Sequence, residues 1–442
     1  MNTKRVLLAL VFVTVFMQQG LEAFAQEARA RYETMKLIRQ EKFDLVLPGA
    51  LRDSDVDMWI HVMQKGNPDA LEMDLGGTAS YSVDDTLGFF IFTDRGEGRI
   101  ERAVLGGRAD RDLYDIFGKE KDITDFVAER DPKRIAVNMS DRLPSADGMS
   151  YSAYKRLVKF IGDKYAQRLV SAENVITLFR VRRVQSEIEA FAKMCEIQRL
   201  LMEEAYGRII PGVTTSEELG WWVQDQLLLM GLDSGDRGIY GPVGPDSRGG
   251  VYNRGLFSSW DLKIRYLNFG TDYKRNAYIL REGETDVPDG IKHAWERGQR
   301  AREILKPTLK VGMTSGEALQ VMIRALEAEG YIHNLSDDKG LYRINANKLG
   351  DSEQSGFTID CHAMGNTGNS EINEGISIAA YRAGRDDFII QQNNIFSFEF
   401  VVNTWVPERG RRMSINFEDN AIITDKGIEF LYPVNNEIII IR

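Results

Sequence analysis

Two glutamates stand in the middle of strand-like runs near the C-terminal end of the sequence. The run 395–402 alternates aromatic and polar residues, which places Glu399 on its polar face. The run 414–423 alternates in the same way around Glu418. A buried carboxylate needs an ionic partner or a metal, whereas a carboxylate on a solvated sheet face needs neither. From these two strands alone, both interpretations stay open.

Two further side chains of metal-ligand type lie upstream, in turn-like segments. Asp272 lies in an aromatic and β-branched stretch, 266–281, whose glycine predicts a tight hairpin. His362 lies in a glycine-punctuated loop, 361–369, and is one of only 4 histidines in the chain. Taken singly, each is better explained as a turn or loop residue. Nothing local brings the two together, and no Cys/His spacing typical of a zinc site occurs.

An internal repeat frames these residues. The segments 211–219 and 311–319 both read as a Gly-x-Thr turn leading into a helix, and these helices are expected to end near Gly231 and Gly330. Two copies are too few for a solenoid. They predict a pseudo-twofold domain with two helix pairs packed on a shared sheet. Such a sheet buries one face under the helices and leaves the other free to form a site.

The remaining elements predict two domains. A capping box at Ser186 and Glu189 indicates the start of a long helix, in which Cys195 falls on the apolar, core-facing side. We place the second domain at 180–442 and a smaller mixed α/β domain, without a catalytic constellation, at 26–179. Its expected strands include 43–47, 87–93 and 134–138, and its expected helix is 151–164.

The first 25 residues predict a cleaved export signal. Lys4 and Arg5 precede an apolar run, 6–17, and the small residues 23–25 form a cleavage site. The apolar run is too short for a comfortable membrane span. We therefore expect a periplasmic or extracellular protein without a membrane anchor.

Composition narrows the class of partner. The chain has 442 residues, too many for one ordinary core, and its 43% hydrophobic and 28% charged residues are typical of a soluble globular protein. A net charge of −10 argues against nucleic acid or an anionic membrane as the main partner. The only cysteines, Cys195 and Cys361, are permitted to pair outside the cytoplasm, but nothing in the sequence requires it.

The order of these elements resembles the pita-bread superfamily, which comprises creatinase, methionine aminopeptidases and Xaa-Pro aminopeptidases. The resemblance rests on the capped helix, the two Gly-x-Thr helices around the Asp272 hairpin, His362-x-x-Gly, and the two glutamate strands, of which the second reads Glu-Asp-Asn. It covers 180–442, and the run after Asp272 is similar to that of the exported bacterial branch. It implies an α+β fold, with a C-terminal pita-bread domain preceded by a creatinase-type α/β domain.

The resemblance also implies a ligand set. Members of the superfamily hold two divalent metals through two aspartates, a histidine and two glutamates. Matched by position, His362, Glu399 and Glu418 take the last three places and Asp272 takes that of the second aspartate. Asn268 falls at the first aspartate, and this match requires a shortened hairpin.

Two substrate-contacting histidines of the superfamily are missing here. Asn369 stands seven residues after the ligand histidine, where one of them belongs, and the segment 251–253 lacks the other.

The matched residues imply a weakened centre with one divalent metal, at most two, chosen from Mn, Co, Fe and Zn. Glu399 is the expected general base.

Three functions follow from this resemblance. The leading hypothesis is an exported Xaa-Pro aminopeptidase-like metallopeptidase that hydrolyses N-terminal peptide bonds and, by analogy, forms a homodimer. The alternative is a non-catalytic pseudoenzyme that binds a peptide or a partner and holds no metal. A metal-independent hydrolase like creatinase is disfavoured, because creatinase relies on a histidine in the place of 251–253.

Overall fold

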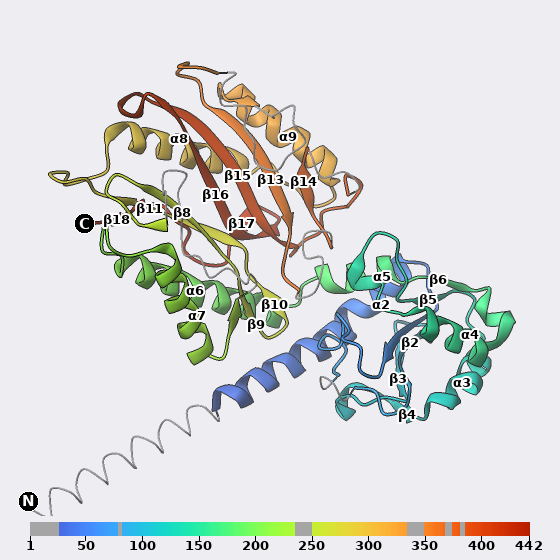
Figure 1. The fold of residues 1–442 in the computed structure, drawn as a ribbon. Coiled ribbons are helices and arrows are strands. Elements are labelled where there is room, and N and C mark those ends of the chain that lie inside the picture. Colours follow the sequence, from blue (N-terminus) through green and yellow to red (C-terminus); the bar gives the residue numbers. More distant parts are fainter. Residues whose placement is uncertain (1–25, 78–81, 235–249, 334–348, 367–373, 381–384) are drawn as a thin grey trace, which may run out of the picture.

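The chain folds into two units joined in sequence by a short linker (Figure 1). The computed structural model describes residues 26–77, 82–234, 250–333, 349–366, 374–380 and 385–442. Within these ranges no helix combines the length and the hydropathy that crossing a bilayer would require.

The N-terminal unit is built on a six-stranded mixed sheet of order β4-β3-β2-β1-β5-β6. Its strands are β1 Met58–Gln64, β2 Leu87–Asp94, β3 Ile100–Leu105, β4 Ile116–Gly118, β5 Ile135–Val137 and β6 Leu169–Ser171. Its helices include α2 Leu47–Asp53, α3 Ile123–Arg130, α4 Tyr151–Ala166 and α5 Glu173–Val181. Apolar residues from alternate strand positions form two separate cores. The expected strands at 87–93 and 134–138 and the expected helix at 151–164 are confirmed.

The strand expected at 43–47 is wrong, because this segment is helical. Lys42–Val46 forms a π-helical turn that continues into α2. Phe43, Val46 and Leu47 are buried at spacings of three and one, as on one face of a helix. A short apolar run does not distinguish a buried strand from a buried helix by periodicity. Helix α5 also runs across the proposed domain boundary at 179/180.

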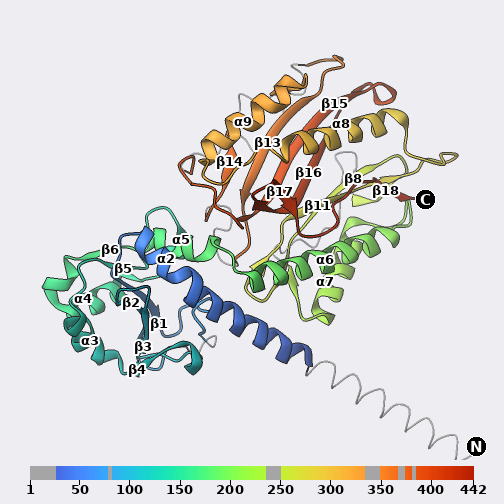
Figure 2. The ribbon, with the colours of Figure 1, turned by 180° about the vertical axis from the view of Figure 1, so that it is seen from behind.

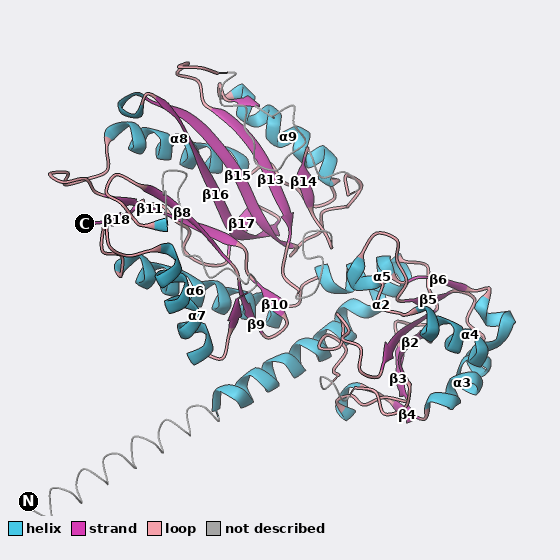
Figure 3. Ribbon diagram, in the orientation of Figure 1, coloured by secondary structure: helices cyan, strands magenta, loops and turns pink. Residues whose placement is uncertain are grey.

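The C-terminal unit has two halves, each pairing two helices with strands (Figure 3). The first half holds α6 Gln185–Gly207, α7 Ser216–Leu229, β7 Asp233–Ser234, β8 Phe257–Leu262, β9 Ile264–Tyr266, β10 Phe269–Gly270 and β11 Tyr273–Ile279. The second holds α8 Asp289–Leu305, α9 Ser315–Ala328, β12 Ile332–His333, β13 Gly356–Ala363, β14 Ser377–Ala379, β15 Ile395–Val406, β16 Arg411–Thr424 and β17 Gly427–Phe430. The last strand, β18 Ile439–Ile441, returns to pair with β11 in the first half. Each helix pair covers its own apolar core.

Threonine caps begin the two repeated helices, as the Gly-x-Thr pattern predicts. The hydroxyls of Thr215 and Thr314 each accept a hydrogen bond of 3.2 Å from the backbone N–H three residues on.

The cap predicted at Ser186 is wrong. Helix α6 begins at Gln185, and the carboxylate of Glu187 accepts the N–H of Val184 at 3.0 Å.

The hairpin expected within 266–281 is only partly present. A tight turn through Leu267, at φ +56°, joins β9 to the two-residue β10. Strand β11 pairs instead with β8, which places Lys274 directly opposite Asp261. Asp272 lies two residues before Lys274, so all three side chains share one face of this strand pair.

The two cysteines are free and fully buried in different cores. Burial raises the pKa of both thiols. Cys195 therefore packs as a core residue, as its helical spacing predicts.

Candidate metal centre

The two glutamates face each other across the longest strand pair of the molecule. In the antiparallel register of β15 and β16, Glu399 lies directly opposite Glu418. The phenylalanines that alternate with Glu399 pack into the core beneath α8 and α9. The glutamates occupy the other face, where their side chains are 0% and 1% exposed. The solvated-face interpretation is therefore excluded for both carboxylates.

His362 on β13 brings the remaining predicted ligands together. Its Nε2 lies 3.6 Å from one carboxylate oxygen each of Asp272, Glu399 and Glu418. Its Nδ1 lies 3.0 Å from the carbonyl oxygen of Ala363 and is positioned to donate to it. In the neutral ring this hydrogen bond leaves the Nε2 lone pair facing the carboxylates, the usual orientation of a metal-ligating histidine.

The spacing of these atoms fits a metal ion. Two ligands at about 2.1 Å from a tetrahedral ion are about 3.4 Å apart, close to the 3.6 Å that separates Nε2 of His362 from each of the three carboxylate oxygens. Asp272, His362 and Glu418 each offer a ligand atom within 4.8 Å of the others, and Glu399 is not part of this mutually close group. In addition, Oδ1 of Asp272 is buried and has no hydrogen-bond partner among the residues that the structure describes, which is costly unless a cation is bound.

Lys274 enters the same cluster, and sequence reasoning missed it. Its Nζ lies 3.0 Å from Oε1 of Glu399 and 3.1 Å from Oδ2 of Asp261, and it also contacts Oε2 of Glu418. Only 10% of the lysine side chain is exposed. Burial lowers the pKa of Lys274, but the surrounding carboxylates raise it well above the ordinary value, so the side chain stays an ammonium.

Lys263 approaches the cluster from its edge. Its Nζ lies 2.9 Å from Oδ2 of Asp272, with 23% of the lysine side chain exposed. Burial lowers the pKa of Lys263, but the charge of Asp272 raises it by more than burial lowers it, so this lysine is also charged. Asp261, which is the outermost carboxylate with 42% of its side chain exposed, adds to that effect.

The cluster strongly favours positive charge. Burial lowers the pKa of His362, but hydrogen bonds to the two glutamates raise it to about 10. Burial opposes ionisation of Glu418, yet Lys274 and His362 hold its pKa well below the usual range. Burial and the charge of Glu418 raise the pKa of Asp272. Burial and the charge of Glu418 also raise the pKa of Asp261, although the partial exposure of this side chain weakens the effect. Protons, ammonium groups and metal ions therefore compete for these carboxylates.

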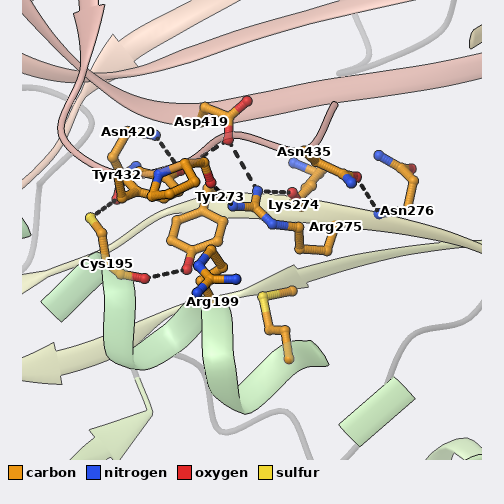
Figure 4. A network of polar contacts seen from close by, with 12 residues as sticks. Cys195, Arg199, Tyr273, Lys274, Arg275, Asn276, Asp419, Asn420, Tyr432 and Asn435 are labelled. Carbon is orange, nitrogen blue, oxygen red and sulfur yellow. Dashed lines mark hydrogen bonds and ion pairs between the residues drawn. The ribbon is translucent and has the colours of Figure 1, made fainter. Parts of the chain in front are cut away.

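A buried ion pair behind the cluster fixes the two strands that carry it (Figure 4). Arg275 follows Lys274 on β11, and its Nη1 donates to Oδ1 of Asp419 on β16 at 3.0 Å. The hydroxyl of Tyr432 donates to the same oxygen at 3.0 Å. Asp419 follows Glu418, so this contact sets the spacing between Lys274 and Glu418. This contact was not predicted from the sequence, and the Glu-Asp-Asn motif is the signal that could have pointed to it.

The predicted degenerate positions lie elsewhere or outside the described residues. Asn268 is buried and donates through Nδ2 to Oδ1 of Asp74, in the N-terminal unit, at 2.7 Å. Asn369 lies outside the described residues. Within 251–253, Tyr252 is fully buried in the core of the first half.

Solved structures share this architecture at low sequence identity. An X-Pro aminopeptidase from Thermotoga maritima matches with a TM-score of 0.60 and 16% identity, over 89% of this chain and 100% of that one. A Xaa-Pro dipeptidase from Bacillus anthracis matches with a TM-score of 0.56 and 16% identity, over 91% and 99%. A prolidase from Pyrococcus horikoshii matches with a TM-score of 0.53 and 15% identity, over 90% and 100%. The fold is the pita-bread fold.

Sequence comparison adds nothing to this likeness of fold. No protein-family model matches the chain, and no match is found among curated proteins. The pita-bread fold, with its smaller N-terminal domain, confirms the fold class expected from the order of motifs. It does not by itself assign an activity.

Proposed function

We propose that this protein is an exported Xaa-Pro aminopeptidase-like metallopeptidase with a single-metal centre. Asp272, His362, Glu399 and Glu418 hold the metal. The observation that carries the proposal is the position of His362, whose Nε2 lies 3.6 Å from three carboxylate oxygens. A peptide substrate is supported by the fold neighbours, which are described as peptidases acting on X-Pro substrates.

Two neighbouring side chains orient Glu399, the residue that we assign as general base. A divalent metal in this centre would lower the pKa of a water molecule and polarise the scissile carbonyl. Glu399 accepts the proton of the attacking water and delivers it to the leaving nitrogen. Its Oε1 accepts hydrogen bonds from Asn416 at 2.8 Å and from Lys274 at 3.0 Å. These two donors hold the carboxylate in one orientation.

We also propose that Asp261, rather than Asn268, corresponds to the first aspartate of the superfamily. Asp261 lies 272 − 261 = 11 residues before Asp272 in the sequence, and the β8–β11 register places it opposite Lys274, on the face that carries Asp272. This assignment needs no shortened hairpin. The ligand set would then be complete, and the departure from the superfamily would lie in the added lysines.

A second candidate function is the non-catalytic pseudoenzyme. The ammonium groups of Lys263 and Lys274 already form ion pairs with the carboxylates, at 2.9 Å to Asp272 and 3.0 Å to Glu399. These contacts favour a cluster stabilised without metal, which would bind a peptide or a partner without cleaving it. Replacement of a substrate histidine by Asn369 points the same way.

The experiment combines metal content with turnover. The purified protein is assayed on X-Pro peptides with Mn²⁺, Co²⁺, Fe²⁺ or Zn²⁺, and bound metal is measured by mass spectrometry. We expect one ion per chain and metal-dependent cleavage. His362→Gln loses both, whereas the matched His333→Gln keeps both, because His333 lies on β12 and packs against Phe357.

Two outcomes separate the candidates. Absence of turnover with every metal would exclude the peptidase. Binding of an X-Pro peptide without cleavage would then support the pseudoenzyme. Export is tested separately by N-terminal sequencing of the mature protein, which is expected to begin at Gln26.

A further inference from the structure

The surroundings of Lys274 resemble those of a bound cation more than those of an ordinary surface lysine. Its ammonium contacts carboxylates from three different strands, with Asp261 on β8, Glu399 on β15 and Glu418 on β16. Lysines are rarely buried to 10% exposure without a matching charge. Here three acidic groups surround one positive charge, which is an arrangement typical of a metal-ion site.

The two glutamates divide their oxygens between two positions. Glu399 directs Oε2 toward Nε2 of His362 and Oε1 toward Nζ of Lys274, at 3.6 and 3.0 Å. Glu418 directs Oε1 toward His362 at 3.6 Å and Oε2 toward Lys274. Carboxylates that share their oxygens in this way bridge two cations in two-metal hydrolytic sites. In this chain the ammonium of Lys274 occupies one of the two positions.

The charge count leads to the same conclusion. Once a metal has displaced the protons of the cluster, His362 is a neutral ligand. The four carboxylates of Asp261, Asp272, Glu399 and Glu418 then contribute −4, and the ammonium groups of Lys263 and Lys274 contribute +2. The remainder is −2, which one divalent ion balances. A second divalent ion at the position of Lys274 would bring two positive groups into contact. Their repulsion inside a buried site is strongly unfavourable.

We propose that Lys274 is a built-in substitute for the second metal ion and limits the centre to one divalent cation. The inference rests on the proposed function in one respect, namely that the His362 side of the cluster binds a metal. It goes further by assigning Lys274 a role as a positioning residue. Lys274 holds Glu399 and Glu418 in the orientation that a second ion would otherwise impose.

Removing the ammonium should therefore create a second metal position. We expect wild-type protein to bind one Mn²⁺ per chain, even at millimolar Mn²⁺, with the electron paramagnetic resonance spectrum of isolated ions. In Lys274→Met, which keeps the length of the side chain but removes the charge, we expect two Mn²⁺ per chain and a spin-coupled spectrum. Lys274→Arg keeps the charge and is expected to bind one.

The matched control is Lys292→Met on α8. Lys292 is 38% exposed and pairs with Asp286 at 2.7 Å, so this variant changes the net charge equally but leaves the cluster intact. We expect one Mn²⁺ per chain, as in the wild type. Because Lys274→Met leaves buried carboxylates without a cation, it is purified in the presence of Mn²⁺ and its folding is checked by circular dichroism.

The outcomes distinguish this inference from the proposed function. If the wild type and the folded Lys274→Met variant each bind one ion, the result supports the metal centre but overturns the proposed role of Lys274. Two coupled ions in the wild type overturn it as well, whether or not the variant folds. If the wild type binds no ion and Lys274→Met binds one, the proposed metallopeptidase activity is excluded, but the result confirms that Lys274 occupies a cation position.

Discussion

Asn268 and Asp261 provide a test at the scale of single residues. Nδ2 of Asn268 donates to Asp74 at 2.7 Å, so its amide is occupied by a contact between the two units. Asn268→Asp would place a second carboxylate beside Asp74. We expect a loss of about 1–3 kcal/mol in the free energy of unfolding, because a donor is replaced by an acceptor in a buried site. Metal content should not change.

Denaturant titration and metal analysis of the same preparation check this prediction. The control is Asn67→Asp, since Asn67 is exposed and its amide donates to the side chain of the nearby Gln64 at 3.3 Å. That change is expected to be nearly neutral. Binding of an additional ion by Asn268→Asp would instead assign Asn268 to the first-aspartate position.

The histidine and the glutamates could be predicted from sequence, whereas their neighbours could not. His362, Glu399 and Glu418 were found because each follows a recognisable local pattern in a recognisable order. Lys274 and Asp261 meet only through the register of β8 against β11, and that register is set by tertiary packing. Lysine, moreover, is not among the residue types that ordinarily bind a divalent metal, so its position in the sequence carries no metal-site signal.

At the scale of elements, a close contact between α8 and β16 restricts the sequence beside the cluster. Gly298 on α8 faces Phe417, the residue before Glu418, and a Cβ at Gly298 would lie 2.0 Å from that ring. The ring cannot move away easily, because it stacks on Phe400 with centroids 5.3 Å apart. Only glycine therefore allows the helix to pack this closely.

Gly298→Ala is expected to destabilise the protein. Alanine gains up to about 1 kcal/mol in helix propensity, but overpacking costs about 1–3 kcal/mol, so the net change lowers the urea midpoint. Gly207→Ala, at the end of α6, is the matched control. A Cβ there meets no atom within 4 Å in the described part of the chain, and we expect the midpoint to rise. A rise in both variants would show that the Phe417 ring yields.

Elements with strong local signals were predicted, and elements that depend on distant partners were not. The caps at Thr215 and Thr314 are local and were correct. The segment 43–47 is mostly apolar, a composition that fits a short strand as well as a helix. Packing beneath the N-terminal sheet therefore decides that it is helical. The partner of β11 was missed because the sequence around Asp261 is only weakly strand-like.

At the scale of the whole molecule, Arg180 joins the two units, which lie side by side in both views (Figures 1 and 2). Its guanidinium donates to Asp74 of the N-terminal unit at 2.8 Å and to Glu374 of the C-terminal unit at 2.6 Å. All three side chains are less than 9% exposed. Breaking a buried ion pair from one side typically costs about 3–5 kcal/mol.

Arg180→Met is therefore expected to lower the free energy of unfolding by about 3–5 kcal/mol, and calorimetry should resolve separate transitions for the two units. Arg208→Met is the control, because Arg208 pairs with Glu204 on the exposed surface of α6 at 2.7 Å. Exposed pairs contribute about 0–1 kcal/mol. Equal effects of the two substitutions would show that Arg180 does not couple the units.

The face-to-face glutamates also determine the order in which the C-terminal unit assembles. Like charges directly opposite each other weaken a strand pair, and a slip of one residue would move them to opposite faces of the hairpin. Lys274, which cancels the repulsion, comes from positions 125 and 144 residues away in sequence. We therefore expect the hairpin of β15 and β16 to reach its final alignment only after β11 has docked, and we expect this late meeting of distant segments to limit the refolding rate.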